Sequence, residues 1–147
     1  MENKLKIKIN AIIESFNVHT KKITKTSKVH NLIVDTGLDE VIDNGLANIG
    51  DMALGIDNTA VSAGDVALLN EVTRQSVSPT NEGLGIREYD DTFLFSSGQS
   101  FTIVEAGLFD SAIISGSTMF NRLVFSGHNV DVDNGVRVRI TMTISAV

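Results

Sequence analysis

Cysteine and tryptophan are absent from this 147-residue sequence, and proline and tyrosine occur only once each. Without cysteine the chain can form neither disulfide bonds nor thiolate metal sites. No apolar run approaches the ~20 residues that a membrane-spanning helix needs. The N-terminal residues alternate charged with apolar side chains, unlike a signal peptide. These absences predict a protein that is made in the cytosol and does not contact a membrane.

The composition is typical of one globular domain. Hydrophobic residues make up 42% of the sequence and charged residues 20%, which is the balance of a folded rather than a disordered chain. A chain of this length buries roughly two-thirds of its unfolded surface. We therefore expect a single domain that spans residues 1–147.

Positive charge is concentrated at one end of the chain. All seven lysines lie at or before Lys28, where only Glu2 and Glu14 oppose them, so the first thirty residues carry a formal charge of +5. Residues 31–147 carry five arginines against sixteen acidic residues, a formal charge of −11. A basic arm can bind DNA, but the net charge of −6 argues against a nucleic-acid-binding protein. We expect no nucleic-acid partner.

Alternating runs predict a chain built mainly of strands. Leu5–Ile13 alternates apolar residues with lysine and asparagine, the pattern of a half-buried strand. Lysine and threonine alternate over Val18–Thr26, which is typical of an edge strand guarded against pairing. A surface loop is expected around Pro79. Further strands are expected at Met52–Ile56, Val72–Val77 and Ile86–Ser96.

Two apolar runs predict a central β-hairpin. Phe101–Phe109 and Met119–Phe125 are rich in β-branched and aromatic residues, and both are short enough to be strands. Residues 110–118 would be the loop between them. Gly107 weakens a strand unless a bulge or a close backbone approach requires it.

One helix is expected. Thr36 or Asp35 can cap its first turn, and Gly50 can end it. A single helical turn also fits Val66–Glu71. The apolar residues that fall on one face of the predicted helix, near Leu38–Asn48, are Leu38, Val41, Ile42, Leu46 and Ile49.

The C-terminal residues predict a second hairpin. Asn134-Gly135 is the strongest short hairpin signal. A three-residue loop, Asp133-Asn134-Gly135, aligns valines with valines and sets Asp131 opposite Arg137, whereas a two-residue loop mixes charged with apolar partners. We therefore predict the three-residue loop, with Gly135 in the left-handed conformation. The same residues begin like a calcium loop, but the glycine stands fifth rather than sixth and the distal glutamate is missing.

These elements make eight or nine strands and one helix, and turn signals recur at intervals typical of a sandwich. No internal repeat indicates a solenoid or a propeller. We predict a mainly β fold: an antiparallel β-sandwich, immunoglobulin-like or related, with one short helix.

The sequence offers no convincing constellation for catalysis or metal binding. His19, His30 and His128 have no grouping of serine or carboxylate near them that indicates a triad or a metal site, and we expect them at the surface or at strand ends. Glu105 and Asp110 are five residues apart, which places them on opposite sides of a strand and disfavours paired acid–base catalysis. We predict a protein that is not an enzyme and has no catalytic residue, cofactor or metal.

Three blocks of the sequence resemble a known family. They are residues 30–38, residues 52–56 followed by a Leu69-x-Glu71-x-x-Arg74 pattern, and residues 101–125, where a T-I-x-E-x-G-L-F-D run precedes an arginine-bearing strand. The blocks resemble small structural proteins of tailed-bacteriophage virions, including collar or tip rings that carry tail fibres. The lysine-rich N-terminal section is a departure from that pattern.

The resemblance implies a virion structural protein, made in the host cytoplasm and not known as an enzyme. Its partners would be copies of itself in a homo-oligomeric ring and other virion proteins of the tail tube, tip or fibre. The alternatives are a capsid decoration protein and a receptor- or carbohydrate-binding module of a tail fibre. Sugar platforms generally use tryptophan and tyrosine faces, and this chain has only Tyr89, which favours the structural interpretation.

The uneven charge also predicts a mode of assembly. If the lysine-bearing strands lie together, a basic surface and an acidic remainder allow identical subunits to associate head to tail, in a ring or a filament. A two-fold dimer would bring like charges together. We assign Lys21, Lys22 and Lys25 to this interface; the alternative is that the lysines only keep the protein soluble.

Overall fold

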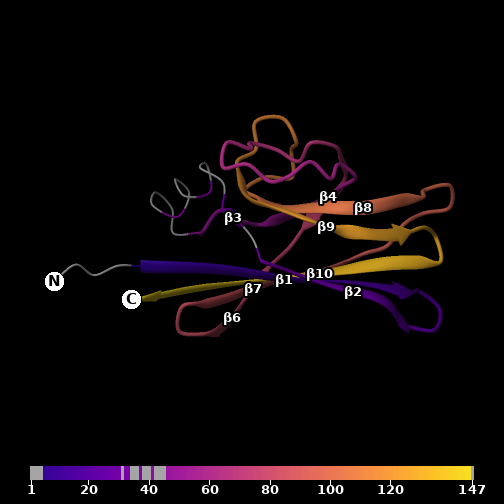
Figure 1. Ribbon diagram of the computed structural model, residues 1–147, viewed down its shortest axis with the longest axis horizontal. Coiled ribbons are helices and arrows are strands. Elements are labelled where there is room, and N and C mark those ends of the chain that lie inside the picture. The colour runs from indigo at the N-terminus through magenta and orange to yellow at the C-terminus, as the bar shows by residue number, and fades with distance from the viewer. Residues whose placement is uncertain (1–4, 31, 34–36, 38–40, 42–45, 147) are drawn as a thin grey trace.

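The computed structural model describes residues 5–30, 32, 33, 37, 41 and 46–146. These residues form two antiparallel sheets that pack face to face (Figure 1), which confirms the predicted mainly β sandwich. The strands of the described residues are β1 (Leu5–Asn17), β2 (Ile23–His30), β3 (Leu32–Ile33), β4 (Asp51–Gly55), β5 (Glu71–Ser76), β6 (Pro79–Gly83), β7 (Ile86–Phe93), β8 (Phe101–Phe109), β9 (Met119–Val130) and β10 (Asn134–Ala146).

Each sheet has five strands. Sheet A has the order β2-β1-β10-β7-β6, and sheet B has the order β3-β9-β8-β4-β5. The two longest strands, β1 and β10, pair over their whole length, from Leu5 opposite Ala146 to Asn17 opposite Asn134. Figure 1 shows sheet A as the lower layer and sheet B as the upper one.

The hydrophobic core lies between the sheets. The period-two alternation of β1 turns Ile9, Ala11 and Ile13 inward, and β10 alternates in the same way. Removing this apolar surface from water is the main stabilising contribution to such a fold. The buried side chains that sheet A contributes from β1 and β10 are Ile9, Ala11, Ile13, Val136, Val138, Ile140 and Met142; sheet B contributes Met52, Leu54, Ile103, Ala106, Leu108, Phe120, Leu123 and Phe125.

The central hairpin is confirmed. β8 and β9 pair antiparallel around a loop of residues 110–118, although β9 continues past Phe125 to Val130. Gly107 is required by a close backbone approach, because a Cβ at this position would lie 2.7 Å from the carbonyl oxygen of Asn121.

Three local predictions are wrong in detail. β2 starts at Ile23 rather than Val18, because the Asn17 side chain accepts the backbone N–H groups of His19 and Thr20 and so builds a turn there. Residues 79–83 form an exposed edge strand instead of a loop; Pro79 is its first residue, where a missing N–H is tolerated. Residues 66–70 form no helical turn. The lysine-rich β2 does lie at a sheet edge, as predicted.

The predicted C-terminal hairpin is wrong in register. Asp131 pairs with Asn134, so the loop consists of Val132 and Asp133. Gly135 lies inside β10 opposite Phe16, and its φ is not positive. The turn leads from β9 in sheet B to β10 in sheet A. It therefore connects the two layers rather than two neighbours in one sheet.

The reason lies in where the valines point. Val130 belongs to sheet B, whereas Val136 and Val138 belong to sheet A, and all three are buried in the shared core. They face one another across the sandwich instead of along a ladder. On the outer face, Arg137 consequently pairs with Asp90 of β7 rather than with Asp131.

The helix predicted near Leu38–Asn48 falls mostly on residues 38–40 and 42–45, which lie outside the described residues. Leu46 lies in a turn with a φ of 74° and is buried, as is Ile49. Among the described residues, no helix is long and apolar enough to cross a membrane.

Candidate functional site

The connection between β4 and β5, residues 56–70, folds over the outer face of sheet B. Leu68 of this loop packs with Ala53, Phe109 and Met119 in a small second core. The loop can come this close because Gly107 has no side chain: a Cβ there would lie 3.2 Å from Leu68 Cδ2. The loop thus forms a third layer above the sandwich (Figure 1).

A fully buried ion pair lies beneath this third layer. Arg122 of β9 donates from Nε to Glu105 Oε2 of β8 at 2.9 Å, and neither side chain is exposed. Glu105 also accepts the backbone N–H groups of Asn70 at 2.9 Å, Leu69 at 3.2 Å and Asp57 at 3.3 Å. The carboxylate therefore ties both ends of the loop to the sheet, and its charge is compensated by an arginine and three amide donors.

The other side of the Arg122 guanidinium contacts the loop itself. Nη1 donates to the carbonyl oxygen of Thr59 at 2.9 Å and to Asp65 Oδ2 at 3.2 Å, and Nη2 donates to the carbonyl oxygen of Asp57 at 3.3 Å. Hydrogen bonds from Thr59 lower the pKa of Asp57, and the charge of Arg122 lowers it further. Six hydrogen bonds from one arginine and its glutamate partner hold a loop that has no strand or helix of its own.

A second arginine holds the neighbouring loop, residues 110–118. Arg74 of β5 makes a bidentate pair with Glu71, at 2.6 and 3.0 Å, and lies over the Phe109 ring at 3.8 Å. Its Nη1 reaches into the loop, donating to the carbonyl oxygen of Ser111 at 2.7 Å and to Ser117 Oγ at 3.0 Å. Asp110 closes the base of the loop by accepting the Thr118 N–H at 2.6 Å.

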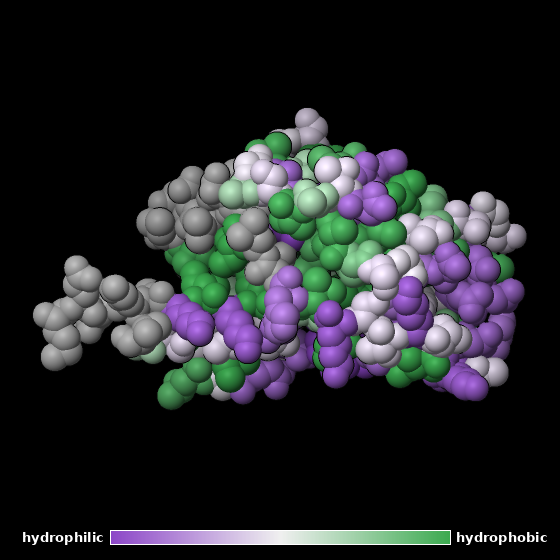
Figure 2. All heavy atoms as spheres, viewed as in Figure 1, coloured by the Kyte–Doolittle hydropathy of each residue, from purple (hydrophilic) through white to green (hydrophobic). Residues whose placement is uncertain are grey.

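These two braced loops present apolar side chains to solvent. The exposed fractions are 38% for Ile56, 64% for Val66, 49% for Leu69, 69% for Ile113 and 64% for Ile114; we call these five side chains the loop platform. Both loops lie above sheet B (Figure 1), and Figure 2 shows more hydrophobic colour on this upper layer than along the lower one. Two neighbouring loops with several exposed apolar side chains are a candidate contact surface.

The loop platform lies in acidic surroundings. Residues 51–76 and 105–122 together carry six carboxylates and two arginines, a formal charge of −4. Both arginines are buried, with side-chain exposures of 5% for Arg74 and 0% for Arg122. They are neutralised by equally buried carboxylates, Glu71 and Glu105, so the negative charge that reaches the surface comes mainly from Asp57, Asp65 and Asp110.

The predicted interface lysines lie on the other layer, around the turn between β1 and β2. Residues 17–30 carry four lysines and no acidic residue, a formal charge of +4. Lys21 and Lys22 are exposed in the turn, and Lys21 lines a hollow of about 350 Å³ on the outer face of sheet A. We call this the β1–β2 hollow; its lining residues are Glu14, Phe16, Lys21, Ile23, Thr92 and Arg137.

Lys25, the third predicted residue, has a structural contact. Its Nζ donates to the carbonyl oxygen of Gly127 in β9 at 2.5 Å. It thereby joins the edge of sheet A to the edge of sheet B, and an inward-directed lysine of this kind also guards an edge strand against pairing. Of the three predicted residues, Lys21 lines the hollow, Lys22 is its exposed neighbour in sequence, and Lys25 contacts β9.

His128 closes the same side of the sandwich and corrects a prediction, because it is fully buried rather than at the surface. Nδ1 contacts Ser15 Oγ at 2.9 Å and Nε2 contacts Ser27 Oγ at 2.8 Å. Burial, followed by the nearby charge of Lys25, lowers the pKa of His128 to about 4. A histidine with so low a pKa is a weak general base at neutral pH, although it contacts two serines. His19 and His30 are exposed, as predicted, and bond to Asp133 and Asn10.

The remaining candidate sites have structural explanations. Asp131 Oδ1 accepts the backbone N–H of Asp133 and the side-chain amide of Asn134, which makes it part of the turn. In the part of the chain that the structure describes, no three His, Cys, Asp or Glu side chains are grouped to hold a metal.

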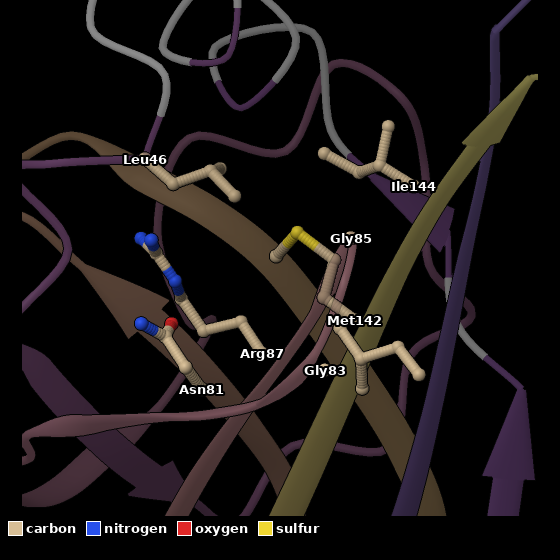
Figure 3. Close-up of a pocket in the computed structure, with 8 residues that line it drawn as sticks. Leu46, Asn81, Gly83, Gly85, Arg87, Met142 and Ile144 are labelled. Carbon is tan, nitrogen blue, oxygen red and sulfur yellow. The ribbon is translucent and has the colours of Figure 1, made fainter.

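A small cavity of about 180 Å³ lies at the turn between β6 and β7. Figure 3 shows Arg87 and Asn81, which are paired across these strands, on the same side of it. Its apolar wall includes Met142, Ile144 and Leu46. Because Leu46 adjoins residues 42–45, which lie outside the described residues, we assign no ligand to this cavity.

Sequence reasoning missed the Glu105–Arg122 pair. The signal was present: a glutamate inside one apolar strand and an arginine inside the strand that returns beside it, where neither charge can stay unpaired. The pair also brings two of the three resemblance blocks into contact. Glu105, Gly107 and Arg122 belong to the block of residues 101–125. They contact the loop that connects residues 52–56 to Glu71 and Arg74 in the other block. Comparisons of this chain with protein-family models, curated proteins and solved structures found no match.

Proposed function

We propose that this chain is a structural subunit of a tailed-bacteriophage virion, a tail collar or tip ring or adaptor component. It would assemble with copies of itself and with other virion proteins of the tail tube, tip or fibre, without nucleic acid, membrane or cofactor as partner. The proposal starts from the resemblance of three sequence blocks to such proteins.

The observation that carries the proposal is the bracing of the loop platform. Residues of two resemblance blocks, Glu105, Arg122 and Arg74 among them, serve to hold two apolar loop tips rigidly in solvent. A rigid apolar surface binds a partner at a low cost in conformational entropy. Such a surface suits a permanent contact in an assembly.

We also propose that the chain is not an enzyme. Glu105, the carboxylate inside the central hairpin, is fully engaged by Arg122 and three backbone amides. His128 is held in its neutral form by burial, with its pKa lowered to about 4. Both groups contribute to packing, and neither is placed to act on a substrate.

Two alternatives place the same surface in other roles. A capsid decoration protein would use the loop platform on a capsid lattice. A receptor- or carbohydrate-binding module would use the loops at the end of a fibre, as many sandwich domains do. Sugar stacking would need an exposed aromatic face, and Tyr89 is fully buried, which supports the structural proposal over the carbohydrate one.

The test is to locate the protein on particles. Antibodies against the purified chain, applied with gold label to virions from the lysate in which the protein is made, should mark one end of the tail or its junction with the capsid. Label spread over the capsid would favour decoration instead. Virions that carry no label, and lack the chain by mass spectrometry, would refute the virion assignment.

A further inference from the structure

We propose that a second copy of this chain docks head to tail, with the loop platform of one copy seated on the β1–β2 hollow of the next. This inference rests on the proposed function, because it takes the chain to be an assembly subunit. It adds the two surfaces that meet and the order in which they meet.

The hollow is suited to an apolar side chain. Phe16 and Ile23 form its apolar part, and Ile23 is 51% exposed. Leu94, which is 64% exposed, lies beside Phe16, since both approach the same point above Gly135. With a volume of about 350 Å³, the hollow is large enough to receive a side chain.

The loop platform supplies a matching projection. Ile113 and Ile114 are consecutive residues of the 110–118 loop, and their exposures of 69% and 64% are the highest of its large apolar residues. Arg74 and Asp110 fix the loop from beneath. An apolar tip held rigidly is already shaped for its contact before binding, so little freedom is lost when it enters a hollow.

The charges of the two surfaces are complementary. The region that carries the loop platform has a formal charge of −4, and residues 14–30, which include Glu14 of the hollow, have +3. An apolar centre with charges at its rim is the usual anatomy of a protein interface. Contact between two platforms, or between two hollows, would bring like charges together.

The backbone at Lys21 supports a role for this side chain. Lys21 has a φ of 63°, in the left-handed region that few residues other than glycine and asparagine adopt. A glycine would relieve the strain, yet a lysine stands here and lines the hollow. Residues held in such conformations are concentrated at functional sites.

The two surfaces lie on opposite layers of the sandwich. The platform covers the outer face of sheet B, and the hollow opens on the outer face of sheet A. A contact between different surfaces of identical chains is heterologous, and it leaves one platform and one hollow free at the ends of every short oligomer. The contact therefore propagates, into a ring where the rotation between copies closes and into a filament where it does not.

Strand addition at the edges of sheet A is a less suitable mode of assembly. At one edge, β2 carries lysines and directs Lys25 inward; at the other, β6 begins with Pro79. Both devices oppose pairing with another strand. In sheet A, side chains on the outer face are left to make the contact.

The test uses two variants that each lack one surface. Lys21→Glu/Lys22→Glu impairs the hollow, and Ile113→Asp/Ile114→Asp impairs the platform. Lys25 is left unchanged because its bond to Gly127 joins the two sheets. Light scattering and sedimentation equilibrium should show concentration-dependent oligomers for the wild-type chain, and each variant alone should have a dissociation constant raised at least about tenfold.

Mixing the two variants is the decisive measurement. The hollow-impaired copy keeps its platform and the platform-impaired copy keeps its hollow, so an equimolar mixture should form a one-to-one dimer that grows no further. A two-fold interface predicts no such rescue. Lys6→Glu/Lys8→Glu changes the net charge equally at the far end of β1, and Leu84→Asp changes another exposed apolar residue; both controls should assemble as the wild type does.

The proposal is overturned by any of three results. The first is a wild-type chain that stays monomeric up to about 1 mM, a concentration at which a binding free energy of only about −4 kcal/mol would be detected. The second is that the variants assemble as well as the wild type. The third is a mixture of the two variants that contains no dimer. A monomer that nevertheless labels virions would refute the head-to-tail contact alone. Self-association without virion label would refute the virion assignment alone.

Discussion

At the scale of single residues, Arg122 and Glu105 have the most consequential contacts of the described chain. A buried ion pair is not in itself strongly stabilising, because desolvation offsets much of the attraction. Its importance here is positional: the pair, with three backbone amides, defines where residues 56–70 lie. Removing one partner leaves the other charged and buried without its closest counter-charge.

Arg122→Met should therefore lower the free energy of unfolding by about 3–5 kcal/mol. Urea denaturation measures this cost, and limited proteolysis should show new cleavage within residues 56–70. The matched control is Arg137→Met, whose partner Asp90 is partly exposed; its cost should stay below about 1 kcal/mol. Equal effects of the two substitutions would show that the brace does not exist.

His128 gives the protein a pH dependence of predictable sign. Its pKa is lowered from 6.5 to about 4 in the folded chain, so the unfolded chain binds a proton first. Stability is complete above pH about 6.5 and falls as the pH is lowered towards 4, by up to about 3 kcal/mol at ~1.4 kcal/mol for each pKa unit. The salt-bridged Asp90, whose pKa Arg137 lowers, loses its contribution only at more acidic pH.

Urea midpoints measured between pH 7.5 and 4.5 should follow this slope in the wild-type chain. His128→Gln keeps polar groups for Ser15 and Ser27 but does not titrate. It should flatten the slope in this range. A wild-type midpoint that does not change between these pH values would mean that His128 stays accessible to protons.

At the scale of elements, the alternation of apolar and polar residues predicted the individual strands, because a strand depends on neighbours in sequence. β1, β8 and the first half of β9 were predictable because their apolar residues repeat with the period of a strand. The change from sheet B to sheet A between β9 and β10 was not predictable. Asn134-Gly135 indicates a turn, but it does not indicate whether the strands on its two sides belong to the same sheet. β10 finds its partners in β1 and β7, which are far away in the sequence.

The candidate site was predictable in the same partial way. Glu105 and Arg122 could be singled out as charges in apolar strands, and Lys21 and Lys22 as part of a basic segment. Their surroundings could not be predicted, because the brace depends on β4 lying between β5 and β8. That strand order brings the loop of residues 56–70 over the ion pair.

The corrected position of Gly135 leads to a prediction about β10. A Cβ at this residue would lie 2.7 Å from Phe16 Cζ and 3.0 Å from the carbonyl oxygen of Phe93. Gly135→Val and Gly135→Asn should each cost more than about 1 kcal/mol, as overpacked sites do. A left-handed turn position would tolerate asparagine well, so the asparagine variant separates the two explanations.

Thermal unfolding would measure both variants. Gly64→Ala is the control, since a Cβ at Gly64 meets nothing within 4 Å; its effect should stay within about 0.5 kcal/mol. If Gly135→Asn is as stable as the wild type, Gly135 lies in a turn rather than in the strand.

At the scale of the whole molecule, the charge asymmetry of the sequence becomes an asymmetry of faces. The lysine-bearing turn belongs to sheet A, and the acidic loops cover sheet B. A small sandwich with opposite charge on its two layers is electrostatically polar, so identical copies can associate with the basic layer of one against the acidic layer of the next. Surface charge of this kind mainly steers association and is screened over about 8 Å at physiological salt. The contact between the apolar tip and the hollow must therefore supply most of the binding free energy.

This division of roles predicts that stability depends on concentration. Association stabilises only the folded chain, by about 2.7 kcal/mol when the free concentration is 100 times the dissociation constant. For a chain of this size, that corresponds to a rise in Tm of roughly 5–10 °C between dilute and concentrated samples. Differential scanning calorimetry over a hundredfold range of concentration measures the rise. The Ile113→Asp/Ile114→Asp variant, which lacks the tip, should show a clearly smaller rise in Tm over the same range of concentration.

Salt separates the two contributions within the same experiment. At 1 M salt the screening length falls to about 3 Å, so the charged rim loses its effect while the apolar contact remains. The rise in Tm with concentration should shrink but persist in the wild-type chain. In Lys21→Glu/Lys22→Glu, high salt should restore part of the rise, because it screens the repulsion that the substitutions introduce. If salt does not affect the rise in Tm with concentration in either chain, the apolar contact alone accounts for association. The lysines would then have no part in the interface.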